Sequence, residues 1–180
     1  MKTLNLLRHA KSGWDDAITR DFDRPLNDKG KRAAAVMGRH LRGLPVRFER
    51  LVASPALRVV QTLEHFAAAY GDMPSPEWNR QVYLASVDTL LDVIHALPEE
   101  TDSVLLAGHN PGLEDLILTL VPDAPGQPLR DAVELKFPTG SFAEIRFDGD
   151  RWADVLAGRG ALGRFVRPRD VDPSLGPNLP

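Results

Sequence analysis

The chain has 180 residues, 43% of them hydrophobic and 26% charged, which is the balance of a globular protein and excludes a disordered or fibrous one. Its 22 basic and 25 acidic residues leave a net charge of −3, so we expect neither nucleic acid nor an anionic membrane surface as partner. The sequence contains no cysteine, which excludes disulfides, thiolate metal sites and a cysteine nucleophile.

The first predicted element is a strand at residues 3–7, within the sequence MKTLNLLRHA. This stretch is too short and too polar for a signal peptide, and no later one approaches the ~18 apolar residues of a membrane span. We therefore expect a cytoplasmic protein. The strand ends at Arg8 and His9, and the alanine-rich segment 26–44 that follows is predicted to be a helix.

A second strand is predicted at residues 50–53, RLVA, with a helix directly after it. Ser54 is a favourable N-cap residue for that helix. Pro55 suits the first helical position, because the N–H that proline lacks would have no partner there. This assignment places Arg58 in the first turn of the helix.

A third unit repeats the pattern further along the chain. Segment 87–97 carries its apolar residues on one face of a predicted helix, and residues 103–107, SVLLA, are predicted to be a strand. His109 lies in the turn after that strand. Asn110 and Pro111 then repeat the cap-then-proline signal, which predicts a third helix start.

The last third of the chain changes character. Residues 140–157 alternate apolar and polar side chains around an Asp-Gly-Asp turn, which is typical of a β-hairpin. The sequence GRGALG at 158–163 matches G-x-G-x-x-G, but too little chain follows it for a dinucleotide-binding unit, so we expect a turn there. Residues 167–180 are rich in proline and predict an extended tail.

Strands that alternate with helices predict an α/β protein. We expect a three-layer α/β/α sandwich whose central sheet is mostly parallel, with antiparallel strands at its C-terminal edge. One domain would occupy residues 1–166 and the tail residues 167–180. Ligands of such sheets bind at the carboxyl ends of the strands, where loops and helix N-termini meet.

Three separate units bring basic or titratable side chains to that edge, namely Arg8, His9, Arg58 and His109. Each residue alone is more often structural or merely exposed than functional. Together they are significant, because guanidinium forks and helix N-termini are both suited to phosphate oxygens. The sequence therefore predicts a compact anion site in a slightly acidic protein.

The motifs LLRHAKSGW, DFDRPLNDKG, VASPALRVVQT and LLAGHNPGLEDL resemble, in this order over about residues 1–121, the histidine phosphatase superfamily and its small phosphohistidine phosphatases of the SixA type. The resemblance implies that His9 is the nucleophile and forms a phosphohistidine intermediate. It implies that Arg8 and Arg58 hold phosphate oxygens and that His109 completes the pocket. The implied activity is a phosphatase that needs no metal or other cofactor.

The sequence departs from the phosphoglycerate mutases of that superfamily. Lys11 stands where they carry glutamate, Ala10 where they carry glycine, and Asp15 where they carry asparagine. The family's general acid is thus left without an obvious residue. Asp21 is our candidate, with Asp23 next, although both residue types are also common in turns and caps.

Leaving-group chemistry suggests that an acid is less important here. An alcohol has a pKa of roughly 16, whereas the conjugate acid of imidazole has a pKa of about 6.5, so breaking N–P needs less proton donation than breaking O–P. We expect the substrate to be a protein phosphorylated on histidine, such as a histidine phosphotransfer or phosphocarrier domain, and the product to be inorganic phosphate.

Two other functions remain open from the sequence. One is a phosphatase of small phosphomonoesters with the same mechanism, and the other is a non-catalytic module that binds phosphate or a phosphoprotein. A metal site is not expected, because His9 and His109 lack the close spacing of metal-binding histidines. Lys11 and Arg24 would either extend the cationic pocket toward a protein substrate or form a solvated rim.

Overall fold

The computed structural model describes residues 1–14, 17 and 20–177. Asp15 and the last three residues of the predicted tail lie outside this part of the chain. Within it, six strands form one sheet with the order β3-β2-β4-β1-β5-β6. The strands are β1 (Lys2–Arg8), β2 (Arg50–Ala53), β3 (Pro76–Trp78), β4 (Ser103–Gly108), β5 (Phe142–Phe147) and β6 (Gly160–Val166). The pairs β1–β4, β4–β2 and β2–β3 are parallel, whereas β1–β5 and β5–β6 are antiparallel.

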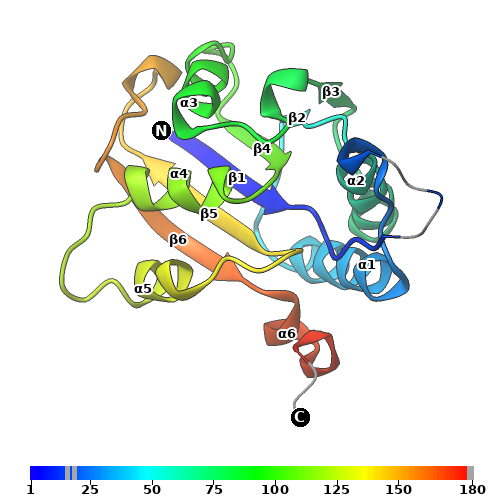
Figure 1. The fold of residues 1–180 in the computed structure, drawn as a ribbon. Helices are drawn as coiled ribbons and strands as arrows, with labels where there is room; N and C mark the ends of the chain where they lie inside the picture. Colours follow the sequence, from blue (N-terminus) through cyan, green and yellow to red (C-terminus); the bar gives the residue numbers. More distant parts are fainter. Residues whose placement is uncertain (15–16, 18–19, 178–180) are drawn as a thin grey trace.

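Helices cover both faces of the sheet (Figure 1). One face carries α1 (Asp28–Arg42) and α2 (Leu57–Tyr70), and the other carries α3 (Val87–His95), α4 (Gly112–Leu120) and α5 (Pro128–Leu135). The short helix α6 (Pro168–Val171) follows β6 and packs against α1. Short 3₁₀ helices lie at Asp21–Asp23, Arg80–Val82, Trp152–Asp154 and Pro173–Leu175. The predicted three-layer α/β/α sandwich is confirmed.

The alternation of side chains along the strands explains why each face of the sheet has its own hydrophobic core. In β1, Leu4 and Leu6 point to the layer of α3, α4 and α5, while Leu7 points to the layer of α1 and α2. Successive side chains of a strand face opposite sides of the sheet, so a strand covered on both faces needs apolar residues at consecutive positions. The central position of β1 therefore explains its nearly unbroken apolar run, which ends at the edge where Arg8 emerges.

The strands predicted at 3–7, 50–53 and 103–107 and the helix at 87–97 are confirmed, each within a residue or two of its expected ends. Two predicted helix starts were wrong. Helix α2 has Ala56 as its N-cap and begins at Leu57, and α4 begins at Gly112 after Pro111. Ser54 precedes the N-cap of α2, and its hydroxyl bonds to His109 and accepts from Ala56 N.

The C-terminal region differs from the predicted hairpin in its second strand. The strand that follows β5 and pairs with it is β6. The chain between β5 and β6 forms a 3₁₀ helix, in which Trp152 is fully buried and donates from Nε1 to Thr101 O at 2.8 Å. The GRGALG motif lies largely in β6. The expected extended tail instead folds as α6 and a 3₁₀ turn, because the side chains of Pro168 and Leu175 are buried.

Candidate active site

The register of the sheet brings the four predicted residues together. Arg8 at the end of β1 pairs with Gly108 at the end of β4, and His9 N donates to Gly108 O at 3.1 Å. The imidazole rings of His9 and His109 lie 5.4 Å apart between centroids. Both rings, with Arg8 and Arg58, line one pocket of ≈ 350 Å³. The described lining also includes Lys11, Ser12, Asp21, Arg24, Leu84, Asn110 and Thr139.

His9 is held in one tautomer. Its Nδ1 lies 2.7 Å from Ala10 O, and because a carbonyl only accepts, Nδ1 carries the hydrogen. The lone pair of the neutral ring therefore sits on Nε2. Burial above all lowers the pKa of His9 to about 4, and the guanidiniums of Arg8, Arg58 and Arg24 act in the same direction, against the hydrogen bond to Ala10. At neutral pH the ring of His9 is thus neutral, and its Nε2 is unprotonated.

His109 is oriented by a residue of another unit. Its Nε2 lies 2.7 Å from Ser54 Oγ, which in turn accepts a hydrogen bond from Ala56 N at 3.3 Å. Burial above all lowers the pKa of His109 to about 3, with further contributions from Arg58 and His9, so the ring is neutral. If the Ser54 hydroxyl donates to Nε2, the hydrogen of His109 is on Nδ1, a buried atom without a partner among the described residues. Nδ1–H is then free to bind an oxyanion.

Arg8 uses only part of the hydrogen-bonding capacity of its guanidinium. Its Nη1 donates to Phe137 O at 2.9 Å, while its buried Nε has no partner among the described residues. Burial lowers the pKa of Arg8, and Glu114 opposes this effect. An arginine nevertheless stays protonated at neutral pH. The guanidinium therefore offers a fixed positive charge with unused hydrogen-bonding capacity.

Arg58 is held by Asp21. Arg58 is only 3% exposed, and its Nη1 and Nη2 donate to Asp21 O at 2.7 Å and Asp21 Oδ2 at 2.9 Å. The same carboxylate accepts from Tyr83 OH at 2.6 Å and Arg24 Nη1 at 3.2 Å. Burial alone would raise the pKa of Asp21, but these hydrogen bonds together outweigh it and lower the pKa to about 2.

A carboxylate with so low a pKa has no proton to donate at neutral pH. The general-acid role expected for Asp21 therefore does not fit its surroundings, which suit it to orienting Arg58. Asp23, the second candidate, pairs with Arg20 Nε at 2.6 Å and is not part of the described pocket lining. Lys11 and Arg24 do line the pocket, as the hypothesis of an extended cationic site required.

The sequence did not predict several residues of the site, among them Ser54, Tyr83 and Leu84. The prediction of Ser54 as a helix cap overlooks its position at the end of β2, which lies at the same sheet edge as His109. Tyr83 gives no local signal, since its hydroxyl reaches Asp21 only through the fold. Leu84 lines the pocket with 53% of its surface exposed and has φ 48°, a left-handed conformation that is rare for a non-glycine residue and often marks functional sites.

Metal-binding clusters and membrane-spanning helices are two features that would indicate other classes of protein. No group of three or more histidine, aspartate or glutamate side chains lies in a position to hold a metal ion within residues 1–14, 17 and 20–177. None of the helices in that part of the chain is long and apolar enough to cross a membrane.

Comparison with known proteins assigns the chain to a family. The sequence model of the histidine phosphatase superfamily (branch 1) matches residues 4–82. An uncharacterised protein of Mycobacterium tuberculosis is 33% identical over 164 residues, which cover 91% of this chain and 100% of that protein. Among solved structures, one assigned to phosphohistidine phosphatase SixA of Nakamurella multipartitia has a TM-score of 0.79 and 32% identity, covering 93% of this chain and 96% of that chain.

A second solved structure is that of the protein histidine phosphatase SixA complexed with tungstate. Its TM-score is 0.76 and its identity 25%, with 94% of this chain and 99% of that chain covered. The similarity therefore extends over more than nine tenths of the chain. On its sequence and its fold, the chain belongs to the histidine phosphatase superfamily, as a phosphatase of the SixA type.

Proposed function

We propose that this phosphatase hydrolyses phosphohistidine in a protein substrate, through a phosphoryl intermediate on His9 Nε2 and without a metal ion. The observation that carries the proposal is the hydrogen bond from His9 Nδ1 to Ala10 O at 2.7 Å, which leaves the Nε2 lone pair available in a pocket lined by Arg8, Arg58 and His109. The histidine of a phosphotransfer or phosphocarrier domain in the cytoplasm is the substrate that we propose.

In the first step, the Nε2 lone pair of His9 attacks the phosphorus atom of the substrate. The N–P bond of the phosphohistidine breaks, and its electron pair returns to the substrate ring. If the other nitrogen of that ring is protonated, the ring leaves as neutral imidazole and needs no further proton. His9 then carries the phosphoryl group on Nε2, and its Nδ1–H still bonds to Ala10 O.

In the second step, a water oxygen attacks the phosphorus atom and the N–P bond of His9 breaks. The bond pair returns to Nε2, which restores the neutral ring with its hydrogen on Nδ1. Both hydrogens of the water stay on the product, dihydrogen phosphate, so the step is balanced without an outside acid. The carbonyl of Ala10 stabilises the positive charge that the phosphorylated ring carries before this step.

The remaining side chains stabilise the phosphoryl group in transit. Arg8 and Arg58 supply fixed positive charge, and His109 would donate from its unpaired Nδ1 to an equatorial oxygen. Donors that are oriented before the reaction stabilise developing charge without reorganising, which is an effective form of catalysis. Two guanidiniums also provide the charge that a metal ion provides in many phosphoryl-transfer enzymes, which supports metal independence.

The pocket favours phosphohistidine over the alternative, small phosphomonoesters. Asp21 is the only carboxylate among the described lining residues, and with a pKa of about 2 it cannot protonate an alkoxide. An imidazole leaving group does not require such an acid, whereas an alcohol does. No observation specifically favours the non-catalytic binding module, and the unprotonated Nε2 of His9 argues for covalent chemistry.

Labelling of His9 tests the proposal directly. A histidine phosphotransfer domain carrying ³²P on histidine would be mixed with the enzyme in EDTA, and the reaction quenched and analysed by mass spectrometry. We expect label on His9 during turnover and none in His9→Ala, with turnover at least about 10³-fold lower in that variant. Wild-type turnover by His9→Ala, or dependence of the wild type on added Mg²⁺ or Zn²⁺, would contradict the mechanism.

A further inference from the structure

A second cavity, of ≈ 310 Å³, adjoins the pocket that His9 and His109 line, which we call the catalytic pocket. We infer that this second cavity binds an acidic segment of the phosphoprotein substrate next to the phosphohistidine. The inference rests on the proposed function and specifies which protein substrates the enzyme selects. Arg8, Lys11 and Thr139 line both cavities, which makes them continuous. We call the second cavity the basic groove, after its six cationic lining residues: Arg8, Lys11, Lys29, Lys136, Arg167 and Arg169.

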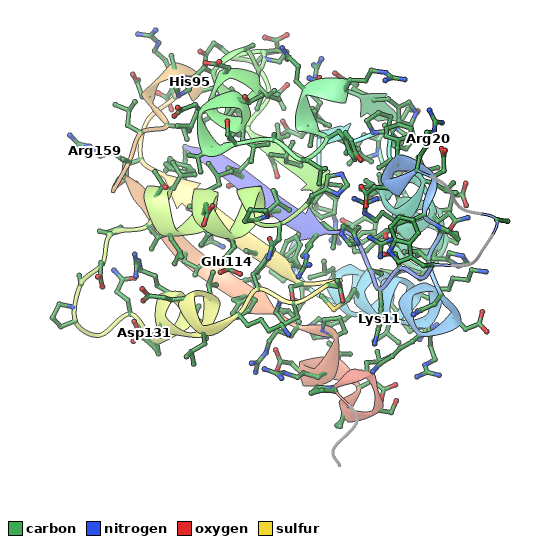
Figure 2. All side chains as sticks on the ribbon, in the orientation of Figure 1. Lys11, Arg20, His95, Glu114, Asp131 and Arg159 are labelled. Atoms are coloured by element: carbon green, nitrogen blue, oxygen red, sulfur yellow. The ribbon has the colours of Figure 1, made fainter. Side chains whose placement is uncertain are left out.

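The C-terminal segment builds one wall of the basic groove. After β6, the chain forms α6 beside α1 (Figure 1). Lys29 Nζ of α1 donates to Gly176 O at 2.6 Å. Burial of Pro168 and Leu175 fixes this segment in place. Arg167 and Arg169 are thereby held in the same cavity as Lys11, which lies beside α1 in Figure 2.

The positive charge of the groove is only partly compensated by nearby acidic residues. No aspartate or glutamate occurs among the described residues that line it. Arg167 is paired with Asp170 at 2.8 Å, but Lys11, Lys136 and Arg169 form no salt bridge with any residue that the structure describes. Like charges in one cavity repel each other, and a cleft of one sign concentrates ligands of the other sign. In a chain of net charge −3, this cluster points to an anionic ligand.

The composition of the groove favours carboxylates on a peptide over a second phosphate group. Three of the six cations are lysines, which are point charges on flexible stems and adapt to carboxylates at variable positions. A phosphate held in fixed geometry is better matched by converging guanidinium forks and backbone N–H groups. The lining also includes Ala33, Pro138 and Leu175, which offer apolar contact to the stems of acidic side chains and to a peptide backbone.

The position of the groove places such a segment beside the reacting group. A phosphohistidine bound at His9 would have its neighbouring residues at the shared wall of Arg8, Lys11 and Thr139. Acidic neighbours would be attracted and basic neighbours repelled. The groove would act mainly on encounter and binding, so its effect belongs in kcat/KM and should fall as salt rises.

Two peptides provide the test, each with one phosphohistidine flanked on both sides by three glutamates or by three glutamines. For the wild type at low salt, we expect kcat/KM to be about tenfold higher with the glutamate peptide, and the preference to shrink at high salt. The double variant Lys136→Glu/Arg169→Glu should lose the preference. Its hydrolysis of phosphoramidate should change less than about twofold, because neither residue is part of the catalytic pocket lining.

A matched control has the same change of charge far from the groove. Arg151→Glu/Arg159→Glu alters two exposed arginines, and Figure 2 shows Arg159 at the opposite side of the molecule from Lys11. This control should keep the preference for the glutamate peptide. Anisotropy of labelled peptides without phosphate measures binding independently of turnover, and only the groove variant should lose the glutamate preference there.

The outcomes separate the two proposals. Equal kcat/KM for both peptides, or loss of the preference in the Arg151/Arg159 control as well, overturns the groove inference and leaves the proposed function intact. An equal fall of phosphoramidate hydrolysis in the groove variant also overturns it, because the phosphate site itself would then be disturbed. If wild-type enzyme hydrolyses neither peptide nor phosphoramidate, the proposed function fails.

Discussion

Asp21 shows how the partners of one carboxylate decide its role. Its two oxygens accept hydrogen bonds from Arg58, Tyr83 and Arg24, and its backbone carbonyl accepts a second bond from Arg58. Because Asp21 fixes both nitrogens at one end of the guanidinium, it determines where Arg58 presents its charge. In the proposed mechanism Asp21 is thus a positioning residue, which stabilises the negative phosphoryl group only through Arg58.

Asp21→Asn should lower kcat/KM by about ten- to a hundredfold, because a charge-assisted hydrogen bond to Arg58 is worth roughly 1.5–3 kcal/mol. The distinguishing readout is the leaving group. A positioning residue affects all donors alike, so phosphoramidate and an alkyl phosphate should lose activity by the same factor. A general acid would matter mainly for the alkyl phosphate. Asp23→Asn, which removes a carboxylate paired with Arg20 at the surface, is the control and should change activity less than twofold.

At the scale of elements, α1 is placed by two glycines that touch backbone. A Cβ at Gly30 would overlap the backbone of Lys11, in the loop that follows β1, and a Cβ at Gly38 would overlap the backbone of Phe66 in α2. Both glycines are buried. The close approach at Gly30 therefore sets the distance between α1 and the loop that carries Lys11, which lines both the catalytic pocket and the basic groove.

Replacing either glycine by alanine should destabilise the protein, although Gly→Ala inside an exposed helix stabilises by about 1 kcal/mol. We expect losses of about 2 kcal/mol or more in the free energy of unfolding, measured in urea, because backbone atoms must move to relieve the overlap. Only Gly30→Ala should also lower kcat/KM, since Gly38 lies against α2 and away from the loop. Gly43→Ala is the control, because φ there is −76° and a Cβ meets nothing closer than 3.4 Å.

Local patterns predicted those elements whose cause is local. The apolar run of β2 and the one-sided periodicity of α3 are sufficient to define them, and the rule that ligands bind at strand ends was sufficient to bring Arg8, His9, Arg58 and His109 together. Long-range contacts decided the rest. The hydroxyl of Ser54 bonds to His109, 55 positions away, and Ser54 is not the N-cap of the helix that follows it. The burial of Trp152 likewise displaces the second hairpin strand to β6, which no local pattern shows.

At the scale of the whole molecule, the site is a concentration of positive charge inside an acidic protein. Two imidazoles are buried beside two guanidiniums, so His9 and His109 are both neutral at neutral pH. In the unfolded chain the same residues would titrate near 6.5. The folded state thus binds fewer protons than the unfolded state below that pH, and the free energy of unfolding must depend on pH there.

The direction of this pH dependence follows from the lowered pKa values of His9 and His109. As pH falls from 6.5 toward 4, the unfolded chain takes up a proton on each histidine and the folded chain does not, so stability decreases by about 1.4 kcal/mol per pH unit for each one. The carboxylate of Asp21 acts in a separate window, because its stabilising effect is lost only as pH falls from 3.8 toward about 2. Urea unfolding of the wild type between pH 4.5 and 7.5 should show the slope of both histidines. His9→Asn and His109→Asn should each reduce that slope by about one proton, and an unchanged slope in both variants would mean that the two rings are protonated in the folded protein.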